Sequence, residues 1–263
     1  MLRRALQPRW IIGGLLVIIA VPGMVRLGFW QLDRLDQRRV FNQRVLAQID
    51  APEMTLDADA LTSDLYNMEF RHVSVTGQYD FYEQVVLRNQ AWNNQIGFQL
   101  LAPLKIEGTD EVVLVERGWI PAENDMPESW AQFDQTGTVT IHGMLRRPEE
   151  LIGVTNFEAQ DDASGRQTSW LSVDLEALSF QTGYDLLPVY VQELPQGEDF
   201  SPPVPVEADI EITEGSHLGY AFQWFTFATI AGIGFPLFMY RELRKEEVEE
   251  NMAGEKDQTV GEE

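Results

Sequence analysis

The sequence predicts an α+β membrane protein: two transmembrane helices flank a mainly antiparallel β domain, a meander or a barrel, with one or two short helices. Three observations predict it. Apolar runs lie near both ends of the 263-residue chain, six or seven strand-like segments lie between them, and most connections between these segments are short. Antiparallel strands can be joined by short turns, whereas a parallel sheet needs a helix after nearly every strand. We therefore expect one β domain between two spans.

The composition narrows the classes of function. The formal net charge is −23, so attraction to nucleic acid would have the wrong sign, and no nucleic-acid partner is expected. The chain has no cysteine, which excludes a thiolate nucleophile and Cys-based zinc or copper sites. No Gly-x-Ser-x-Gly, phosphate-loop or metalloprotease motif occurs. The nucleophile candidates therefore lack the motif context of the common hydrolases.

The first apolar run follows a basic start and is interrupted only by Arg26. We predict a cytoplasmic N-terminus over residues 1–9 and an uncleaved transmembrane helix over residues 10–30, with Arg26 reaching the outer surface. A cleaved signal peptide is the alternative, but residues 21–23 (Val-Pro-Gly) make only a weak cleavage site. The continued apolar pattern favours the membrane anchor.

The middle of the chain carries the β signals. Apolar residues at helical spacing predict a helical connector over residues 31–50, and residues 51–196 are expected to form the β domain. One helix is expected over residues 174–182, with Asp174 as N-cap and Gly183 as its stop. The expected strands, in which β-branched or aromatic residues alternate with polar ones, are 70–77, 84–89, 97–106, 111–120, 138–146, 168–173 and 189–194.

The second span is predicted over residues 217–240, after an extended linker (197–216) and before an acidic cytoplasmic tail (241–263). The linker's last residues carry acidic but no basic side chains, whereas Arg241 and its basic neighbours follow the span directly. Because basic flanks face the cytoplasm, both termini should be cytoplasmic. The β domain is then extracytoplasmic, on a multi-pass protein of the plasma membrane whose helices contact the lipid bilayer.

Small residues predict close packing of the two spans. Ala221, Ala228 and Gly232 form a ridge at roughly helical spacing in the second span. Gly13 and Gly14 offer a groove in the first span, so the ridge is expected to lie against them.

The chain has three histidines. His72 and His142 alternate with apolar residues of their strands, which predicts solvated positions on the outer face of the sheet. An extracytoplasmic hydrolase built around either of them, with a clustered serine or aspartate, is an alternative function.

His217 differs because it stands at the mouth of the second span. Tyr220 and Trp224 follow it on one helix face, and Phe227 lies near the same stripe. Histidine is a common ligand of haem iron, so His217 could bind haem along these rings. An interfacial histidine beside an ordinary aromatic belt is the other interpretation, and spacing alone favours it.

Residues 113–121 read Val-Leu-Val-Glu-Arg-Gly-Trp-Ile-Pro, a strand that ends in a specific corner. We expect a structural corner in which Arg117 is tied to a carboxylate and Trp119 packs beside it. The alternative is a binding role, in which Arg88 and Arg117 clamp a carboxylate such as a porphyrin propionate.

Four blocks of the sequence resemble the Surfeit locus protein 1 family of cytochrome c oxidase assembly factors. The blocks keep the family's order on a two-span hairpin with a large outer loop, and the likeness covers nearly the whole chain. Two positions depart from the family: Ser216 stands where Asn is frequent, and Glu116 where Asn or Asp is common. The blocks are 27–35 (Leu-Gly-Phe-Trp-Gln-Leu-Asp-Arg-Leu), 97–104 (Gly-Phe, then Pro-Leu), 115–121 (Val-Glu-Arg-Gly-Trp-Ile-Pro) and 217–225 (His-Leu-Gly-Tyr-Ala-Phe-Gln-Trp-Phe).

The resemblance implies a membrane assembly factor that is not an enzyme. It would help haem a insertion into, or stabilisation of, cytochrome c oxidase subunit I, with haem A synthase as a further partner. It makes His217 the candidate axial ligand of transiently held haem a, with Tyr220 and Trp224 as its wall. Arg117 and Trp119 become part of the domain corner. The resemblance also reverses the preference at His217 toward a ligand. The alternative is a membrane-tethered module that stabilises an oxidase subunit without binding haem.

Overall fold

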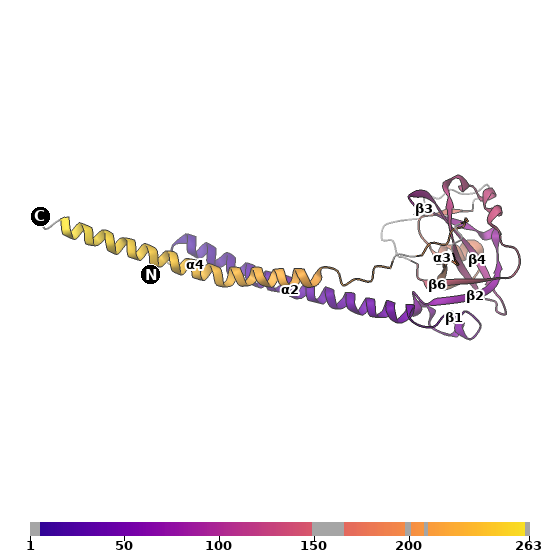
Figure 1. The fold of residues 1–263 in the computed structure, drawn as a ribbon, viewed down its shortest axis with the longest axis horizontal. Helices are drawn as coiled ribbons and strands as arrows, with labels where there is room; N and C mark the ends of the chain where they lie inside the picture. The colour runs from indigo at the N-terminus through magenta and orange to yellow at the C-terminus, as the bar shows by residue number, and fades with distance from the viewer. Residues whose placement is uncertain (1–5, 149–165, 198–200, 208–209, 261–263) are drawn as a thin grey trace. The chain divides into compact units, whose positions relative to one another are not determined.

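A computed structural model gives the fold (Figure 1). The chain divides into two compact units: Met1–Gln43 with Ile212–Glu263, called here the helical unit, and Arg44–Glu211, called the β unit. Each is described by itself. The residues that the structure describes are 6–148, 166–197, 201–207 and 210–260.

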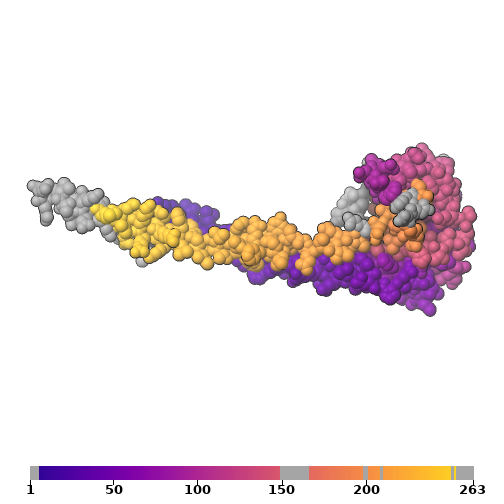
Figure 2. Space-filling model, in the orientation of Figure 1, coloured from indigo at the N-terminus to yellow at the C-terminus, as the bar shows by residue number. Residues whose placement is uncertain are grey.

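The helical unit is built from two long helices, α2 (Pro8–Ile49) and α4 (His217–Val260). Each contains a segment long and apolar enough to cross a membrane. The two helices lie side by side over these segments (Figures 1 and 2). Their contacts run in opposite order, because Arg9 pairs with Glu246 whereas Gln31 meets His217. The helices are therefore antiparallel.

Along both α2 and α4, buried residues recur every seven positions. Gly28, Leu35 and Asn42 are buried on α2, and Ala221 and Ala228 are buried on α4. This spacing is the heptad repeat of helices that pack over a long distance. The close packing predicted from small residues is therefore confirmed.

The predicted partners of the small residues were only partly right. A Cβ at Gly13 would lie 2.7 Å from the ring of Phe235, so this glycine receives an aromatic side chain rather than the alanine ridge. No atom lies within 4 Å of a Cβ built at Gly14. Gly232 instead faces Val21, at 3.7 Å from the built Cβ. The groove predicted at Gly13 and Gly14 is wrong, because Gly13 faces the ring of Phe235 and Gly14 faces none of the ridge residues among those that the structure describes.

The β unit is a five-stranded barrel extended by three further strands. The sheet order is β1-β2-β6-β8-β5-β4-β3-β7, and a pairing of β2 with β4 closes β2, β6, β8, β5 and β4 into the barrel. Within the barrel only β5 and β8 are parallel. The predicted fold class is confirmed. The strands are β1 (Met54–Thr55), β2 (His72–Tyr79), β3 (Val85–Trp92), β4 (Gln95–Ile106), β5 (Val112–Pro121), β6 (Val139–Arg146), β7 (Ser169–Trp170) and β8 (Leu186–Glu193).

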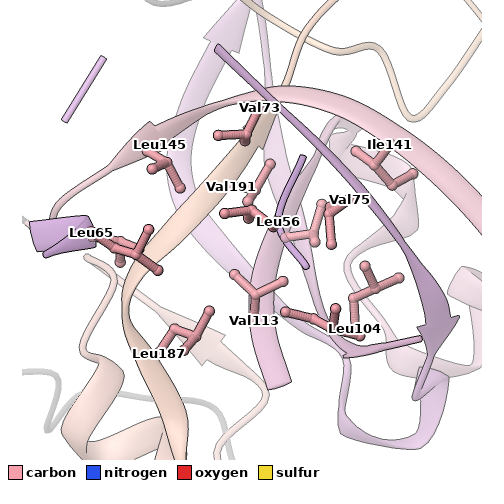
Figure 3. Close-up of a cluster of buried hydrophobic side chains, with 13 residues drawn as sticks. Leu56, Leu65, Val73, Val75, Leu104, Val113, Ile141, Leu145, Leu187 and Val191 are labelled. Carbon is pink, nitrogen blue, oxygen red and sulfur yellow. The ribbon is translucent and has the colours of Figure 1, made fainter. Parts of the chain in front are cut away.

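The barrel interior is filled by aliphatic side chains that alternate along the strands (Figure 3). Val73 and Val75 of β2 point inward, as do Val113 of β5 and Val191 of β8. Each has an exposed fraction near zero, so burial of this cluster is the main stabilising term of the barrel. The period-2 pattern that predicted the strands is this division into interior and exterior faces.

A second core lies under the predicted helix, α3 (Leu175–Thr182). The Asp174 carboxylate accepts the backbone N–H of Ala177 at 3.0 Å, and Gly183 ends the helix in the left-handed conformation. Both predicted ends are confirmed. Short 3-10 helices cover Ala60–Thr62, Leu65–Met68, Phe81–Glu83, Ala122–Asn124 and Pro127–Phe133.

Candidate functional site

His217 is the first residue of α4, and its ring is held by the other helix. Its Nδ1 atom lies 2.8 Å from the side-chain oxygen of Gln31 in α2. The imidazole is half-buried. In the part of the chain that the structure describes, no hydrogen bond reaches the other ring nitrogen, Nε2. The site therefore has one nitrogen engaged and one available.

The first and fourth motif blocks meet around this hydrogen bond. Gly28 lies against Phe225: a Cβ on the glycine would be 2.6 Å from the phenylalanine ring. Phe29 packs edge-on against the same ring, with centroids 5.4 Å apart and planes at 77°. The residues between 27 and 35 and those between 217 and 225 therefore form one structural site of the helical unit, although they lie far apart in the sequence.

Aromatic side chains flank His217 along α4. Tyr220 is 49% exposed and Phe227 is 43% exposed, whereas Trp224 is half-buried. Trp224 and Phe227 make an edge contact with centroids 6.2 Å apart. At 100° per residue these three residues lie on one flank of the helix, beside the buried face that contains Ala221. The flank offers ring surface to a flat apolar molecule.

Ser216 forms the start of α4. Its backbone carbonyl accepts the N–H of Tyr220 at 3.1 Å, which places it at the N-cap position. Serine and asparagine are both favoured N-cap residues. The departure from the family's frequent asparagine therefore preserves the local helix start.

Arg117 lies inside the β unit and is only 2% exposed. Its guanidinium donates to the side-chain oxygen of Gln84 at 2.8 Å and to the backbone carbonyl of Phe133. It also stacks over the rings of Tyr79 and Phe81, at 4.9 and 5.1 Å from their centroids. Burial lowers the pKa of the guanidinium.

This environment corrects one sequence-based expectation. An amide and a carbonyl hold Arg117, and no carboxylate forms an ion pair with it among the described residues. The burial of its guanidinium favours the structural interpretation of the corner over a propionate clamp. Arg88, the other half of that expected clamp, is half-buried on β3.

Glu193 is a carboxylate that acts electrostatically on Arg117 and that the sequence did not indicate. It lies on the same face of β8 as Val189 and Val191, whose side chains fill the barrel interior. Burial raises the pKa of Glu193 to about 7, although the positive charge of Arg117 acts in the opposite direction. The end of the barrel therefore holds a carboxyl group that titrates near neutrality.

Trp119 holds the linker that returns toward α4. Its backbone N–H and carbonyl exchange hydrogen bonds with Val204, at 2.7 and 2.8 Å. Gly118 has φ +138°, and a Cβ there would lie 2.5 Å from the Val204 carbonyl. A Cβ on Gly97 would lie 2.5 Å from the indole nitrogen of Trp119. The second and third motif blocks thus interlock and anchor the linker, a role that the sequence did not reveal.

Glu116 lies in a buried polar row next to this anchor. One of its oxygens accepts the side-chain amides of Gln99 and Gln192, at 2.6 and 3.1 Å. Gln192 also donates to the Val206 carbonyl at 3.2 Å. Burial raises the pKa of Glu116, and these amides partly oppose the shift. Glu116, the second departure from the family, therefore belongs to a network of buried hydrogen bonds.

His72 and His142 lie on the outer face of the barrel, opposite in direction to the interior Val73 and Ile141. His142 contacts Glu53 at 2.8 Å and pairs across the strands with Ser74. The Ser74 hydroxyl bonds to Thr55 instead, and no hydrogen bond joins it to His142 in the described chain. This geometry does not support the hydrolase alternative, which required a nucleophile activated by a histidine.

A β-barrel inserted between two helices able to cross a membrane, with a histidine held at the start of the second helix, defines a class of membrane-anchored barrel proteins. The SURF1 family model matches residues 18–229, and the chain belongs to this family. The resemblance inferred from the four blocks is thereby confirmed. SURF1 proteins are known as oxidase assembly factors and are generally non-catalytic.

Curated relatives cover most of the chain. A SURF1-like protein of Rickettsia bellii (strain RML369-C) is 28% identical over 225 residues, which span 81% of this chain and 85% of the relative. Surfeit locus protein 1 of Arabidopsis thaliana is 24% identical over 261 residues, 80% of this chain and 73% of the relative. An uncharacterized SURF1-like protein of Mycobacterium bovis is 27% identical over 242 residues, 91% and 86% of the two chains.

Proposed function

We propose that this protein helps cytochrome c oxidase assembly by holding haem a at His217 for insertion into subunit I, or for stabilisation of that subunit. The observation that carries the proposal is the pairing of His217 with Gln31 at the start of a helix long and apolar enough to cross a membrane, where no other described residue forms a hydrogen bond with Nε2. Family membership supports the link to oxidase assembly.

The residues around His217 fit haem in chemistry and in exposure. Neutral imidazole is a regular axial ligand of haem iron, which is the cargo here. Tyr220 and Phe227 expose about half of their side-chain surface, and Trp224 lies between them along the helix. These rings would pack against the porphyrin, and His217 would bind the haem iron. The buried corner at Arg117 and Trp119 would support the domain and would not touch the cargo.

The proposed location is the plasma membrane, with both termini in the cytoplasm and the β unit outside. Arg241, Arg244 and Lys245 follow the apolar part of α4, and basic residues favour the cytoplasmic flank. Subunit I is the proposed partner in the membrane, and haem A synthase is the proposed source of the haem. Labelling of cysteines introduced at Ser74 and at Met252 in intact cells tests this topology: only the Ser74 position should react from outside.

The direct test is purification from cells that make haem a. We expect a haem spectrum in the wild-type protein, its loss in His217→Ala, and an accompanying loss of assembled oxidase. Phe222→Ala, which removes an exposed ring of α4 outside the described flank, is the matched control and should keep both. A haem-free wild-type protein together with normal oxidase assembly in His217→Ala would contradict the proposal.

The second candidate function is a tethered module that stabilises an oxidase subunit without haem. Large apolar side chains exposed on the β unit favour it: Phe180 is 93% exposed and Ile96 is 76% exposed. Such side chains are suited to contact with another protein. If this candidate is correct, Phe180→Asp or Ile96→Asp should impair oxidase assembly, and His217→Ala should not.

A further inference from the structure

We propose that Gln31 is a positioning residue for His217. Its side-chain oxygen accepts a hydrogen bond from the N–H at Nδ1, which leaves Nε2 with the lone pair that can bind a metal. This inference rests on the proposed function, because a free donor nitrogen matters only if the imidazole binds a metal centre.

The geometry of the hydrogen bond determines the tautomer. A neutral imidazole has one N–H and one lone pair, and an amide oxygen can only accept. Since the Gln31 oxygen lies 2.8 Å from Nδ1, the proton resides on Nδ1. The lone pair is then on Nε2, the atom without a hydrogen bond within the described residues. Histidines that bind metals are regularly fixed in this way by a hydrogen bond to the other ring nitrogen.

The helix packing holds Gln31 in place. Gln31 is half-buried and lies between two buried residues of the same helix face, Gly28 and Leu35. Gly28, three residues before Gln31, lies against the ring of Phe225 and so brings the two helices close together next to the hydrogen bond. The contact between Gln31 and His217 is therefore part of the packed interface, unlike a pair of mobile surface side chains.

Gly215, two residues before the helix, lies near the edge of the ring that carries Nε2. Gly215 has φ +65°, and a Cβ built on it would lie 3.4 Å from Cδ2 and 3.6 Å from Nε2 of His217. A Cβ at this position would be in van der Waals contact with the edge of the ring that carries Nε2. Glycine satisfies the left-handed backbone and keeps this approach open.

The neutral amide also suits a carrier. A carboxylate in place of Gln31 would polarise the Nδ1 proton more strongly and make Nε2 a stronger donor. An amide gives the orientation with a weaker electronic effect. Transfer to another protein requires that the cargo be released, so the glutamine matches transient holding better than permanent binding.

Nitrogen NMR on the cargo-free full chain in detergent tests the tautomer. With histidines labelled with nitrogen-15, and His217 assigned through His217→Ala, we expect at pH 8.5 a protonated Nδ1 and an unprotonated Nε2. Gln31→Leu should give a mixture of tautomers. The control is Gln37→Leu, which removes a glutamine of the same helix that accepts from Arg34. A protonated Nε2 in the wild type, or an unchanged His217 signal in Gln31→Leu, would overturn the inference.

Binding of haem a to the same purified variants separates this inference from the proposed function. We expect Gln31→Leu to weaken binding roughly 10- to 100-fold, Gln31→Glu to strengthen it, and Gln37→Leu to leave it unchanged. Equal binding by Gln31→Leu and wild type overturns the positioning role. If the wild type binds no haem while His217 shows the expected tautomer, the proposed function fails and the assignment of the Gln31 hydrogen bond stands. Circular dichroism of each variant reports whether the helices are intact.

Discussion

The two units of this molecule each place a glutamine against a nitrogen-bearing side chain, with opposite results. In the β unit, Gln84 accepts from Arg117 at 2.8 Å, a carbonyl accepts a second hydrogen bond, and two aromatic rings cover the guanidinium. In the helical unit, Gln31 accepts from His217 at the same distance, but the imidazole is half-buried and its second nitrogen is available. A closed environment indicates a structural role, and an open one indicates binding.

The motif blocks follow the same division. Blocks 27–35 and 217–225 pack together through Gly28 and Phe225, whereas blocks 97–104 and 115–121 pack together through Gly97 and Trp119. In both pairs a glycine lets an aromatic ring approach the backbone. The pair in the helical unit contains the half-buried His217, whereas the pair in the β unit anchors the linker through Trp119. Variants in the two pairs should therefore separate loss of function from loss of fold.

The largest loss of stability is expected from a change at Arg117, the buried side chain of the β unit. Arg117→Met should destabilise the β unit by roughly 3 to 5 kcal/mol, because two buried acceptors lose a charged donor. His217→Ala should leave the unfolding of the β unit unchanged. Thermal unfolding of the full chain in detergent, followed by the β signal in circular dichroism, checks both. A stable Arg117→Met protein would reverse the comparison.

The pH dependence should also come from the barrel. The folded pKa of Glu193, about 7, exceeds the unfolded value near 4.3, so the folded state binds the proton more tightly. Its stabilising contribution is present below about pH 4.3 and is lost as pH rises through 7, a change of about 4 kcal/mol. Glu193→Gln should flatten this slope in denaturant unfolding at pH 5 and pH 8.

The control for that measurement is Glu214→Gln. Glu214 is exposed, and its hydrogen bond with Arg39 lowers its pKa, so its contribution has the opposite sign: it is present above the unfolded pKa and lost as pH falls. An unchanged pH slope in Glu193→Gln would show that another group causes the dependence.

The linker anchor gives an intermediate effect. Gly118→Ala should cost at least about 2 kcal/mol, because its backbone conformation is strained for alanine and its Cβ would meet Val204. Gly108→Ala also has a positive φ, but no atom lies within 4 Å of its Cβ, so strain alone should cost about 1 kcal/mol. Equal losses in the two unfolding curves would exclude a special role for the linker contact.

The smallest effect is expected in the helical unit. Gly28→Ala should weaken the packing of α2 and α4 by about 1 to 2 kcal/mol, because the Phe225 ring must move. Gly14→Ala meets no atom within 4 Å and should be neutral. A double-cysteine crosslink between α2 and α4, compared in both variants, measures the difference. Reduced crosslinking in both variants would indicate a general effect of alanine.

Local patterns predicted much of the fold, and long-range contacts explain what they missed. Six of the expected strands are present at nearly their predicted bounds, because apolar and polar residues alternate with the period of a sheet, whereas the strand expected over 168–173 is only the two-residue β7. α3 begins and ends at its predicted caps. β1 was missed because two residues carry no periodic signal. Barrel closure depends on the pairing of β2 with β4, which no local pattern encodes.

The site was predictable only in part for the same reason. His217 stood out by its position before an apolar run, but its partner Gln31 is separated from it by 186 positions. The partner of Arg117 was expected to be a carboxylate and is the amide of Gln84, since aromatic stacking and a carbonyl satisfy the buried charge without an acid. Spacing within one element cannot reveal such contacts.

The central claim is that function resides at His217 and that the barrel corner serves the fold. Its most direct test is the amount of assembled oxidase that contains haem a, measured in cells that express His217→Ala at the wild-type protein level. The barrel of the variant must first be shown to be folded. We predict a large loss of assembled oxidase in these cells. Wild-type oxidase content in the presence of a folded His217→Ala protein would contradict the account.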